Sequence, residues 1–258
     1  MQVRAAFLSD LHLGARECHA REIASFLRTI KADTLYLVGD VIDIWSMRRG
    51  IYWPASHHEV LGLILDKARN GTRVIYVPGN HDELARALCK SVIAGIEVHE
   101  ELVHRTRRGQ RMLVIHGDAF DSAVRFSPLL KATGSALYTV ALYAGMYVNF
   151  VRSLMGKEHW SLATWIKARV GNAQEYVEKF EHAAATAAAE RGLDGVICGH
   201  IHRPRVARIA GVLYCNDGDW VEHCTALIED RSGEIRLWQH RERILEAIPL
   251  PLPLRGAA

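Results

Sequence analysis

The sequence predicts an α/β fold in which two mixed sheets lie face to face with helices on the outside. Over about the first hundred residues, short apolar β-branched runs alternate with amphipathic segments, which is the βαβαβ pattern of a parallel sheet. From Ile96 onwards, short strands joined by glycine-containing turns predict hairpins instead. A long helical stretch between His116 and His200 predicts an insertion into this framework.

The N-terminal part is predicted to alternate strands with helices. Ile23, Phe26, Leu27 and Ile30 recur at helical spacing, and Asn70-Gly71 is a typical helix stop. The expected strands are 5–9, 34–38 and 73–78, the expected helices are about 19–30, 57–70 and 83–94, and 44–55 is expected to be irregular.

The C-terminal part is predicted to consist mainly of short strands. They are expected at 97–98, 102–106, 111–115, 195–198, 206–209, 212–216, 224–228 and 235–240, with a helix at about 162–191 and a loose proline-containing tail from 249.

Residues 132–151 contain no charged side chain. Their length alone would allow a membrane span. Polar residues such as Thr133, Ser135 and Asn149 dilute the run, however, and the strands on either side must stay in one compartment. We therefore interpret 122–175 as a helical lid inserted into a single domain that covers 1–258.

Composition places the chain among ordinary globular proteins. Of its 258 residues, 49% are hydrophobic and 24% are charged, which is enough apolar material for a full core. A net charge of +3 is too small to argue for a nucleic-acid partner. The five cysteines are scattered and odd in number, and no signal peptide is visible, so we expect a cytoplasmic protein.

Five of the predicted strands are each followed by Asp, Asn or His. In open α/β sheets ligands bind at the carboxyl ends of the strands, so strands that shared one sheet would bring these side chains to one site. The segments are Asp10-Leu11-His12, Gly39-Asp40-Val41-Ile42-Asp43, Gly79-Asn80-His81-Asp82, His116-Gly117-Asp118 and Gly199-His200-Ile201-His202.

This set of side chains indicates a metal site. Carboxylate, imidazole and amide groups together suit Mn²⁺, Fe²⁺ or Zn²⁺ better than Ca²⁺. Seven candidate ligands are too many for one ion, and Asp40 is the natural bridge between two. Each segment alone has a simpler interpretation, since Gly-Asn-His-Asp also forms turns and a lone His116 is more often structural. The combination in this order is what favours a metal centre.

These five segments resemble those of the calcineurin-like metallophosphoesterase superfamily. The resemblance spans residues 10–202 and implies a four-layer αββα sandwich with a dinuclear metal centre and a bridging hydroxide that attacks phosphorus. It implies that one metal is held by Asp10, His12 and His202, the other by Asn80, His116 and His200, and that Asp40 bridges them. It further implies that His81 contacts the phosphate or protonates the leaving oxygen, oriented by Asp82. The substrate is predicted to contact Asn80, His81, Asp121 and Arg125.

Within the superfamily the chain is most similar to the bacterial UDP-2,3-diacylglucosamine diphosphatases of lipid A synthesis. The shared features are the early Asp10, the His-Gly-Asp segment at Asp118 and the helical insertion, but that group carries Arg where His81 stands here. The resemblance implies a hydrolase, with Mn²⁺ the expected metal, that cleaves a phosphoanhydride or phosphodiester bond of a lipid-linked substrate at the inner membrane surface.

Two other functions stay open. A nucleotide phosphodiesterase or nuclease could use the same fold, although its expected basic track is represented only by the arginines of the 105–111 hairpin. A non-catalytic interaction module would be expected to have lost metal ligands, and none of the seven candidates is missing.

Overall fold

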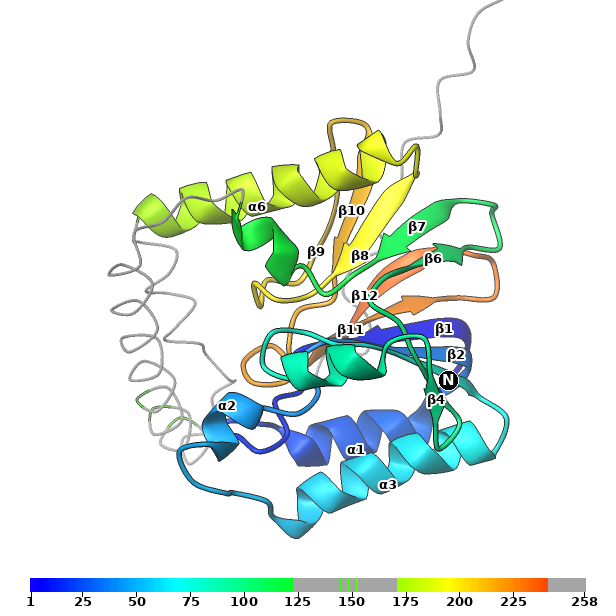
Figure 1. The fold of residues 1–258 in the computed structure, drawn as a ribbon. Coiled ribbons are helices and arrows are strands. Elements are labelled where there is room, and N and C mark those ends of the chain that lie inside the picture. The colour runs from blue at the N-terminus through cyan, green and yellow to red at the C-terminus, as the bar shows by residue number, and fades with distance from the viewer. Residues whose placement is uncertain (123–143, 145–147, 149–151, 153–170, 241–258) are drawn as a thin grey trace, which may run out of the picture.

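The computed structural model describes residues 1–122, 144, 148, 152 and 171–240. Two mixed sheets lie face to face, as the sequence predicts (Figure 1). The seven-stranded sheet has the order β12-β11-β1-β2-β3-β5-β4. Its strands are β1 (Gln2–Leu8), β2 (Lys31–Val38), β3 (Arg73–Val77), β4 (Val92–Ile93), β5 (Ile96–Val98), β11 (Thr225–Glu229) and β12 (Ile235–Gln239).

The five-stranded sheet has the order β6-β7-β8-β10-β9. Its strands are β6 (Leu102–Arg105), β7 (Arg111–Val114), β8 (Gly195–Cys198), β9 (Arg205–Ile209) and β10 (Val212–Asn216). Both sheets are parallel at the centre and antiparallel at the edges: β1, β2, β3 and β5 run parallel in the first, and β7, β8 and β10 in the second.

Helices cover the outer face of each sheet, which completes the four layers (Figure 1). The helices α1 (Ala20–Thr29) and α3 (Ala55–Arg69) pack below the seven-stranded sheet, and α6 (Gly171–Glu190) packs above the five-stranded one. Smaller helices are α2 (Ile44–Met47) and the 3-10 helices η1 (Glu83–Leu88) and η2 (Asp118–Ser122). The predicted stop at Asn70-Gly71 is confirmed, because Asn70 caps α3 and Gly71 has a φ of +91°.

Three apolar layers hold these elements together. Phe26 and Leu27 of α1 pack under the seven-stranded sheet, Phe7 and Ile197 lie between the sheets, and Phe180 of α6 packs on the five-stranded sheet. Because every central strand is covered on both faces, the centres of both sheets are rigid supports for the loops at their carboxyl ends.

The structure corrects three details of the sequence prediction. The five strands followed by polar side chains do not share one sheet: β1, β2 and β3 belong to the larger sheet, and β7 and β8 to the smaller. The predicted helix 83–94 is wrong beyond residue 88, because Val92 and Ile93 form strand β4 against β5. The expected irregular segment 44–55 contains the short helix α2.

Several predictions fall outside the described residues. The charge-free run 132–151 is outside them apart from the isolated residues 144 and 148. So are Arg125, the start of the predicted helix at 162–170 and the proline-containing tail from 249. Within the described residues, no helix is both long enough and apolar enough to cross a membrane.

Candidate metal centre

The loops that follow β1, β2, β3, β7 and β8 are joined to one another by hydrogen bonds. The backbone N–H of Asp10 donates to the Gly39 carbonyl at 3.0 Å, and that of Gly199 to the His116 carbonyl at 3.0 Å. The β3 loop joins the β2 loop because the His81 N–H donates to Oδ1 of Asp40 at 2.8 Å. The two sheets are linked directly, because the His200 N–H donates to Oδ2 of Asp10 at 2.9 Å. All seven predicted metal ligands therefore stand on one connected set of loops.

Asp10, His12 and His202 form the first group of candidate ligands. Nε2 of His202 lies 3.1 Å from Oδ1 of Asp10 and 3.2 Å from Nε2 of His12. At these distances the lone pairs of the two imidazole nitrogens and the carboxylate oxygen would repel one another. A cation shared by the three atoms would remove that repulsion. These are the three residues that the resemblance assigned to one metal, and that assignment stays a prediction.

Asp40, His116 and His200 form the second group. Nε2 of His116 lies 3.5 Å from Oδ2 of Asp40 and 3.3 Å from Oδ1 of Asn80. The same Oδ2 of Asp40 lies 4.0 Å from Nε2 of His12 in the first group. Asp40 thus stands between the two groups, where a bridging carboxylate belongs.

The surroundings of these side chains fit divalent metal ions. His116 donates from Nδ1 to the Val38 carbonyl at 2.9 Å, and Nδ1 of His12 lies 3.1 Å from Asp43, which leaves Nε2 of each ring as the candidate ligand atom. Oδ1 of Asp10 is buried and meets no donor in hydrogen-bond geometry within the described part of the chain. A cation would satisfy that oxygen, and the His and Asp clusters are consistent with a dinuclear site.

Burial and mutual attraction shift the pKa values of these groups strongly. Burial alone would raise the pKa of Asp40, but His116 and His12 hold it well below its usual range. Burial likewise opposes a charged His116, yet the Asp40 and Asp10 carboxylates raise the pKa of its imidazole to about 10. Without metal, protons therefore supply the positive charge that the carboxylates require.

Five of the predicted ligands have left-handed backbone conformations. The φ angles are 52° at Asp10, 49° at His12, 52° at Asp40, 70° at His200 and 52° at His202. Each such non-glycine residue costs roughly 1–3 kcal/mol and persists only where the surroundings enforce it, which is typical of functional sites. A Cβ on Gly39 would overlap the His116 imidazole, so this loop also requires a glycine.

His81 stands beside the metal ligands, but the prediction that Asp82 orients it is wrong. The Asp82 carboxylate instead accepts from backbone N–H groups, among them those of Val41 at 2.7 Å and Gly79 at 2.6 Å. Nδ1 of His81 lies 3.0 Å from Oδ1 of Asp43, an ion-pair contact whose angle is outside the hydrogen-bond range. Trp45 packs on the imidazole, with ring centroids 4.3 Å apart.

Sequence reasoning also missed the support behind Asp10. The Ser9 hydroxyl contacts Oδ2 of Asp10 and lies 2.6 Å from Oδ1 of Asp217, a fully buried acid far along the chain. Burial raises the pKa of Asp217 well above its ordinary value. The turn Asn216-Asp217-Gly218 was the only available signal, and it indicates a turn more readily than a site.

Of the predicted substrate contacts, Asn80 and His81 lie beside the metal ligands, whereas Arg125 is outside the described residues. Oδ1 of Asp121 lies 3.1 Å from Nε2 of His200. Its role as a substrate contact stays a prediction.

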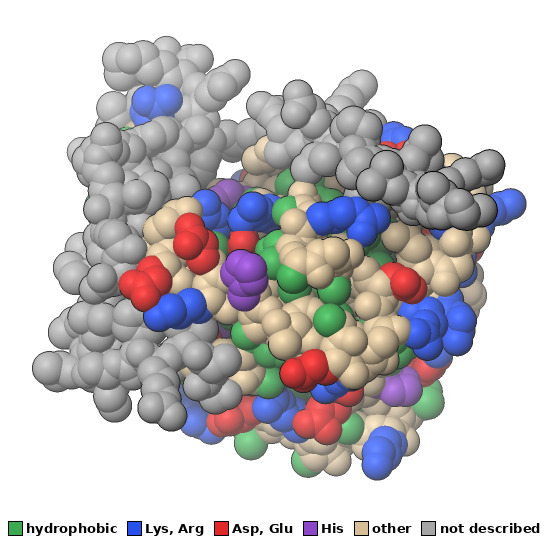
Figure 2. All heavy atoms as spheres, turned by 90° about the horizontal axis from the view of Figure 1, so that it is seen from above, with side chains coloured by type: hydrophobic (Ala, Val, Ile, Leu, Met, Phe, Trp, Pro, Cys, Tyr) green, Lys and Arg blue, Asp and Glu red, His purple; other side chains and the backbone are tan. Residues whose placement is uncertain are grey.

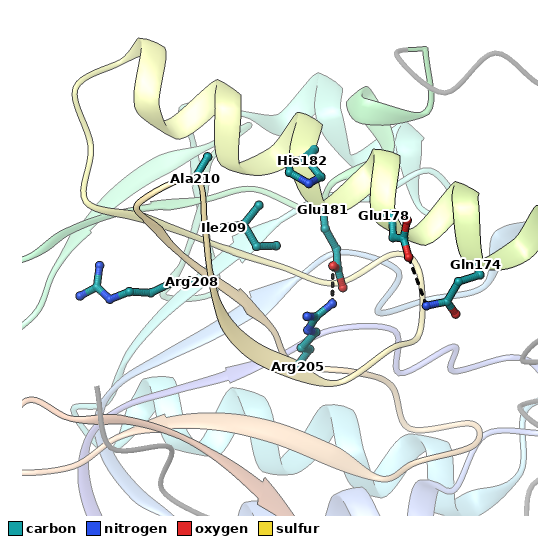
Figure 3. Close-up of a pocket in the computed structure, with 8 residues that line it drawn as sticks. All are labelled: Gln174, Glu178, Glu181, His182, Arg205, Arg208, Ile209 and Ala210. Carbon is teal, nitrogen blue, oxygen red and sulfur yellow. Dashed lines mark hydrogen bonds and ion pairs between the residues drawn. The ribbon is translucent and has the colours of Figure 1, made fainter. Parts of the chain in front are cut away.

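A separate cavity of about 370 Å³ opens between α6 and β9 (Figure 3). Glu181 and Arg205 form an ion pair at its wall, and Arg208 and His182 also line it. None of its lining residues is a candidate metal ligand.

Comparison with known proteins agrees with the geometry. A UDP-2,3-diacylglucosamine hydrolase of Xanthomonas campestris pv. campestris is 28% identical over 242 residues, covering 88% of this chain and 95% of the relative. One from Xanthomonas axonopodis pv. citri is 29% identical over 246 residues with the same coverage. The solved structure of YfcE, a phosphoesterase from E. coli, is 14% identical, has a TM-score of 0.49 and covers 94% of this chain and 96% of its own. That structural likeness is too weak to argue from.

The family comparison decides the assignment. The model of the calcineurin-like phosphoesterases matches residues 3–204, which include every candidate metal ligand. The chain belongs to the calcineurin-like phosphoesterase family and is a metal-dependent phosphoesterase.

Proposed function

We propose that this protein is a dinuclear-metal hydrolase that cleaves a phosphoanhydride or phosphodiester bond of a lipid-linked substrate such as UDP-2,3-diacylglucosamine. The observation that carries the proposal is the intact set of ligands around Asp40, with the His81 imidazole next to it. Nε2 of His81 lies 3.9 Å from Oδ2 of Asp40, and 24% of the His81 side chain is exposed. A phosphate held by the ligand set would therefore be within reach of this imidazole.

Two divalent cations, with Mn²⁺ expected and Fe²⁺ or Zn²⁺ as alternatives, would neutralise phosphate charge and lower the pKa of water at this site. The protein groups then have separate tasks. His81 can give a proton to the leaving oxygen, and the buried Asp43 carboxylate lies 3.0 Å from Nδ1 of its imidazole. The side-chain oxygen of Asn80 can serve as a metal ligand, and its amide N–H as a donor to a phosphate oxygen.

We expect the phosphoryl group to be transferred directly to water, without a covalent enzyme intermediate. Ser9 is held between two buried carboxylates, and burial raises the pKa of the Cys198 thiol well above its ordinary value. Neither group is an activated nucleophile. Single-turnover hydrolysis in ¹⁸O water should label the phosphoryl product, and a trapped phosphoenzyme would contradict this course.

Two observations support a lipid-linked substrate. The relatives named for UDP-2,3-diacylglucosamine hydrolysis cover 88% of this chain. The run 132–151, which is largely outside the described residues, carries no charge, and a run of this kind is unusual on a soluble surface. Lysines and arginines beside it, such as Arg125 and Arg152, would favour peripheral contact with an anionic membrane surface.

The test compares an acylated with a non-acylated substrate. With Mn²⁺, release of UMP from UDP-2,3-diacylglucosamine should exceed release from UDP-N-acetylglucosamine by at least about 100-fold in kcat/KM, because burial of acyl chains contributes about 0.8 kcal/mol per methylene. Leu142→Asp with Met146→Asp should abolish this preference and leave hydrolysis of bis(p-nitrophenyl) phosphate intact. If both activities fall together with the melting temperature, the run belongs to the core and the lipid assignment fails.

A nucleotide phosphodiesterase or nuclease is the second candidate, and His81 is the observation that favours it. The lipid A enzymes that the chain resembles carry Arg at this place, whereas an imidazole suits proton transfer to a nucleoside or nucleotide leaving group. Acidic and basic side chains are interspersed over the described part of the face in Figure 2, which speaks against a long nucleic-acid track there. Faster turnover of a cyclic dinucleotide than of the acylated sugar nucleotide would favour this candidate.

A further inference from the structure

One face of α6 is directed at His200. Tyr176 and Phe180 stand four residues apart on this helix and therefore share a face. The Phe180 ring packs on the His200 imidazole with centroids 5.9 Å apart, and His116 lies on another side of it at 5.1 Å. The Tyr176 hydroxyl donates to Oδ1 of Asp121 at 2.6 Å.

Asp121 connects this tyrosine to the metal centre. The oxygen that accepts from Tyr176, Oδ1, also lies 3.1 Å from Nε2 of His200. An ionised carboxylate only accepts hydrogen bonds, so Nε2 of His200 must carry a proton, and Nδ1 is then the nitrogen with a free lone pair. Burial and the Asp121 charge raise the pKa of the Tyr176 hydroxyl, which therefore stays a donor.

His200 thereby differs from two other candidate ligands. Nδ1 of His12 contacts the Asp43 carboxylate, and Nδ1 of His116 contacts the Val38 carbonyl. In both rings this leaves Nε2 for the metal. In His200 the contacted atom is Nε2. The choice of ligand atom is thus made separately for each imidazole by the group behind it.

We propose that Tyr176 and Asp121 are positioning residues that hold His200 in its Nε2-protonated tautomer, so that Nδ1 is the metal ligand. The inference rests on the proposed dinuclear function, and it ties the metal centre to α6. Asp121 acts through His200 in this proposal and does not need to touch the substrate.

The first test reads the tautomer directly in metal-free protein. Two-bond ¹H–¹⁵N spectra at about pH 8.5, above the ordinary titration range of imidazole, distinguish the two neutral tautomers. Comparison with His200→Gln identifies the signals of residue 200. The wild type should show the Nε2-protonated form, Asp121→Ala should lose it, and Asp121→Asn, whose amide oxygen can still accept, should restore it.

The second test measures Mn²⁺ binding by calorimetry after chelation. Loss of a group that orients a metal-binding histidine typically weakens affinity about 10–100-fold, so Asp121→Ala should weaken one of the two ions by this factor and Tyr176→Phe by about 10-fold or less. Tyr36→Phe is the matched control, because the Tyr36 hydroxyl lies 2.9 Å from Nδ1 of His104 in the core between the sheets. It removes the same oxygen atom from a tyrosine–histidine pair and should leave both ions unchanged.

The outcomes separate this inference from the proposed function. A wild-type His200 protonated at Nδ1, or unchanged tautomer and Mn²⁺ affinity in Asp121→Ala and Tyr176→Phe, would overturn it. If the wild type binds a single ion, the dinuclear function fails while the tautomer measurement still decides the role of Asp121. If Asp121→Ala does not fold, the Mn²⁺ affinity of Tyr176→Phe is compared with that of Tyr36→Phe. Weaker binding of one ion in Tyr176→Phe alone supports the inference, and equal binding overturns it.

Discussion

Oδ1 of Asp43 lies 3.0 Å from Nδ1 of His81, while Oδ2 of the same carboxylate lies 3.1 Å from Nδ1 of His12. One buried acid therefore supports both a candidate metal ligand and the candidate proton donor. Burial alone would raise the pKa of Asp43, but His12 and His81 hold it far below its usual range. The Asp43 carboxylate therefore stays charged beside both imidazoles.

Replacing this acid should separate catalysis from metal binding. Asp43→Asn keeps an oxygen for His12 but removes the negative charge beside Nδ1 of His81. At saturating Mn²⁺ we expect kcat to fall about 10²–10⁴-fold, the range of general acid catalysis, with two ions still bound. Steady-state kinetics and metal analysis check this. Asp82→Asn is the comparison variant. Its side chain is a weaker acceptor for the four backbone N–H groups that donate to the Asp82 carboxylate, so this variant should have a lower melting temperature. Unchanged kcat in Asp43→Asn would remove Asp43 from the proton-transfer role.

If Asp40 bridges two metal ions, replacing Asp40 and replacing His81 should affect metal binding and turnover differently. Asp40→Ala should collapse the dinuclear site, because this carboxylate stands between both groups of ligands. His81→Ala should retain both ions and lose turnover. Elemental analysis after dialysis against Mn²⁺, paired with activity, measures both effects. Fully active protein with one ion or fewer per chain would refute the two-metal assignment.

The stability of metal-free protein should pass through a maximum with pH. Asp40 and Asp43 have folded pKa values below the unfolded value of about 3.9, so their stabilisation is present above that pH and is lost on further acidification. The folded pKa of His116 is raised to about 10, so its stabilisation is complete below the unfolded value of about 6.5 and is lost as the pH rises towards 10.

Thermal unfolding with a chelator, from about pH 3 to 10, should therefore show the highest melting temperature near pH 5–6. Excess Mn²⁺ should remove the alkaline decline, because the metal replaces the proton on His116 and its affinity rises with pH. His116→Asn should flatten the alkaline side without metal. A chelated wild type that is equally stable at pH 6 and pH 9 would contradict the assignment.

The close approach of Gly39 to His116 can be tested against a glycine with the same backbone conformation. Gly39 has a φ of +84° and Gly109 one of +83°, but a Cβ at Gly109 would meet nothing within 4 Å. Alanine at either position costs roughly 1–2 kcal/mol for the left-handed backbone. Gly39→Ala should add the overlap with the His116 ring, and it should both melt lower than Gly109→Ala and lose one Mn²⁺ ion. Equal melting temperatures and Mn²⁺ stoichiometries would show that the loop has room for the methyl group.

The identity and order of the candidate ligands were determined by the sequence itself. An apolar β-branched run followed directly by Asp, Asn or His is a local pattern, because side-chain alternation and turn chemistry act over a few residues. The strands that precede Asp10, Asp40, Asn80, His116 and His200 were all predicted and are confirmed. So were α1, α3 and the hairpins of the C-terminal part.

Only the tertiary structure decided which groups stand behind those ligands. The sequence prediction paired His81 with Asp82, whereas the packing of the β2 and β3 loops places Asp43 beside it. Asp217 reaches Ser9 across 208 residues, and Tyr176 reaches Asp121 across 55. Val92 and Ile93 follow the edge of a sheet rather than their helical spacing. Local periodicity encodes the type and direction of an element, whereas partnerships between distant side chains arise only when two sheets and α6 pack together.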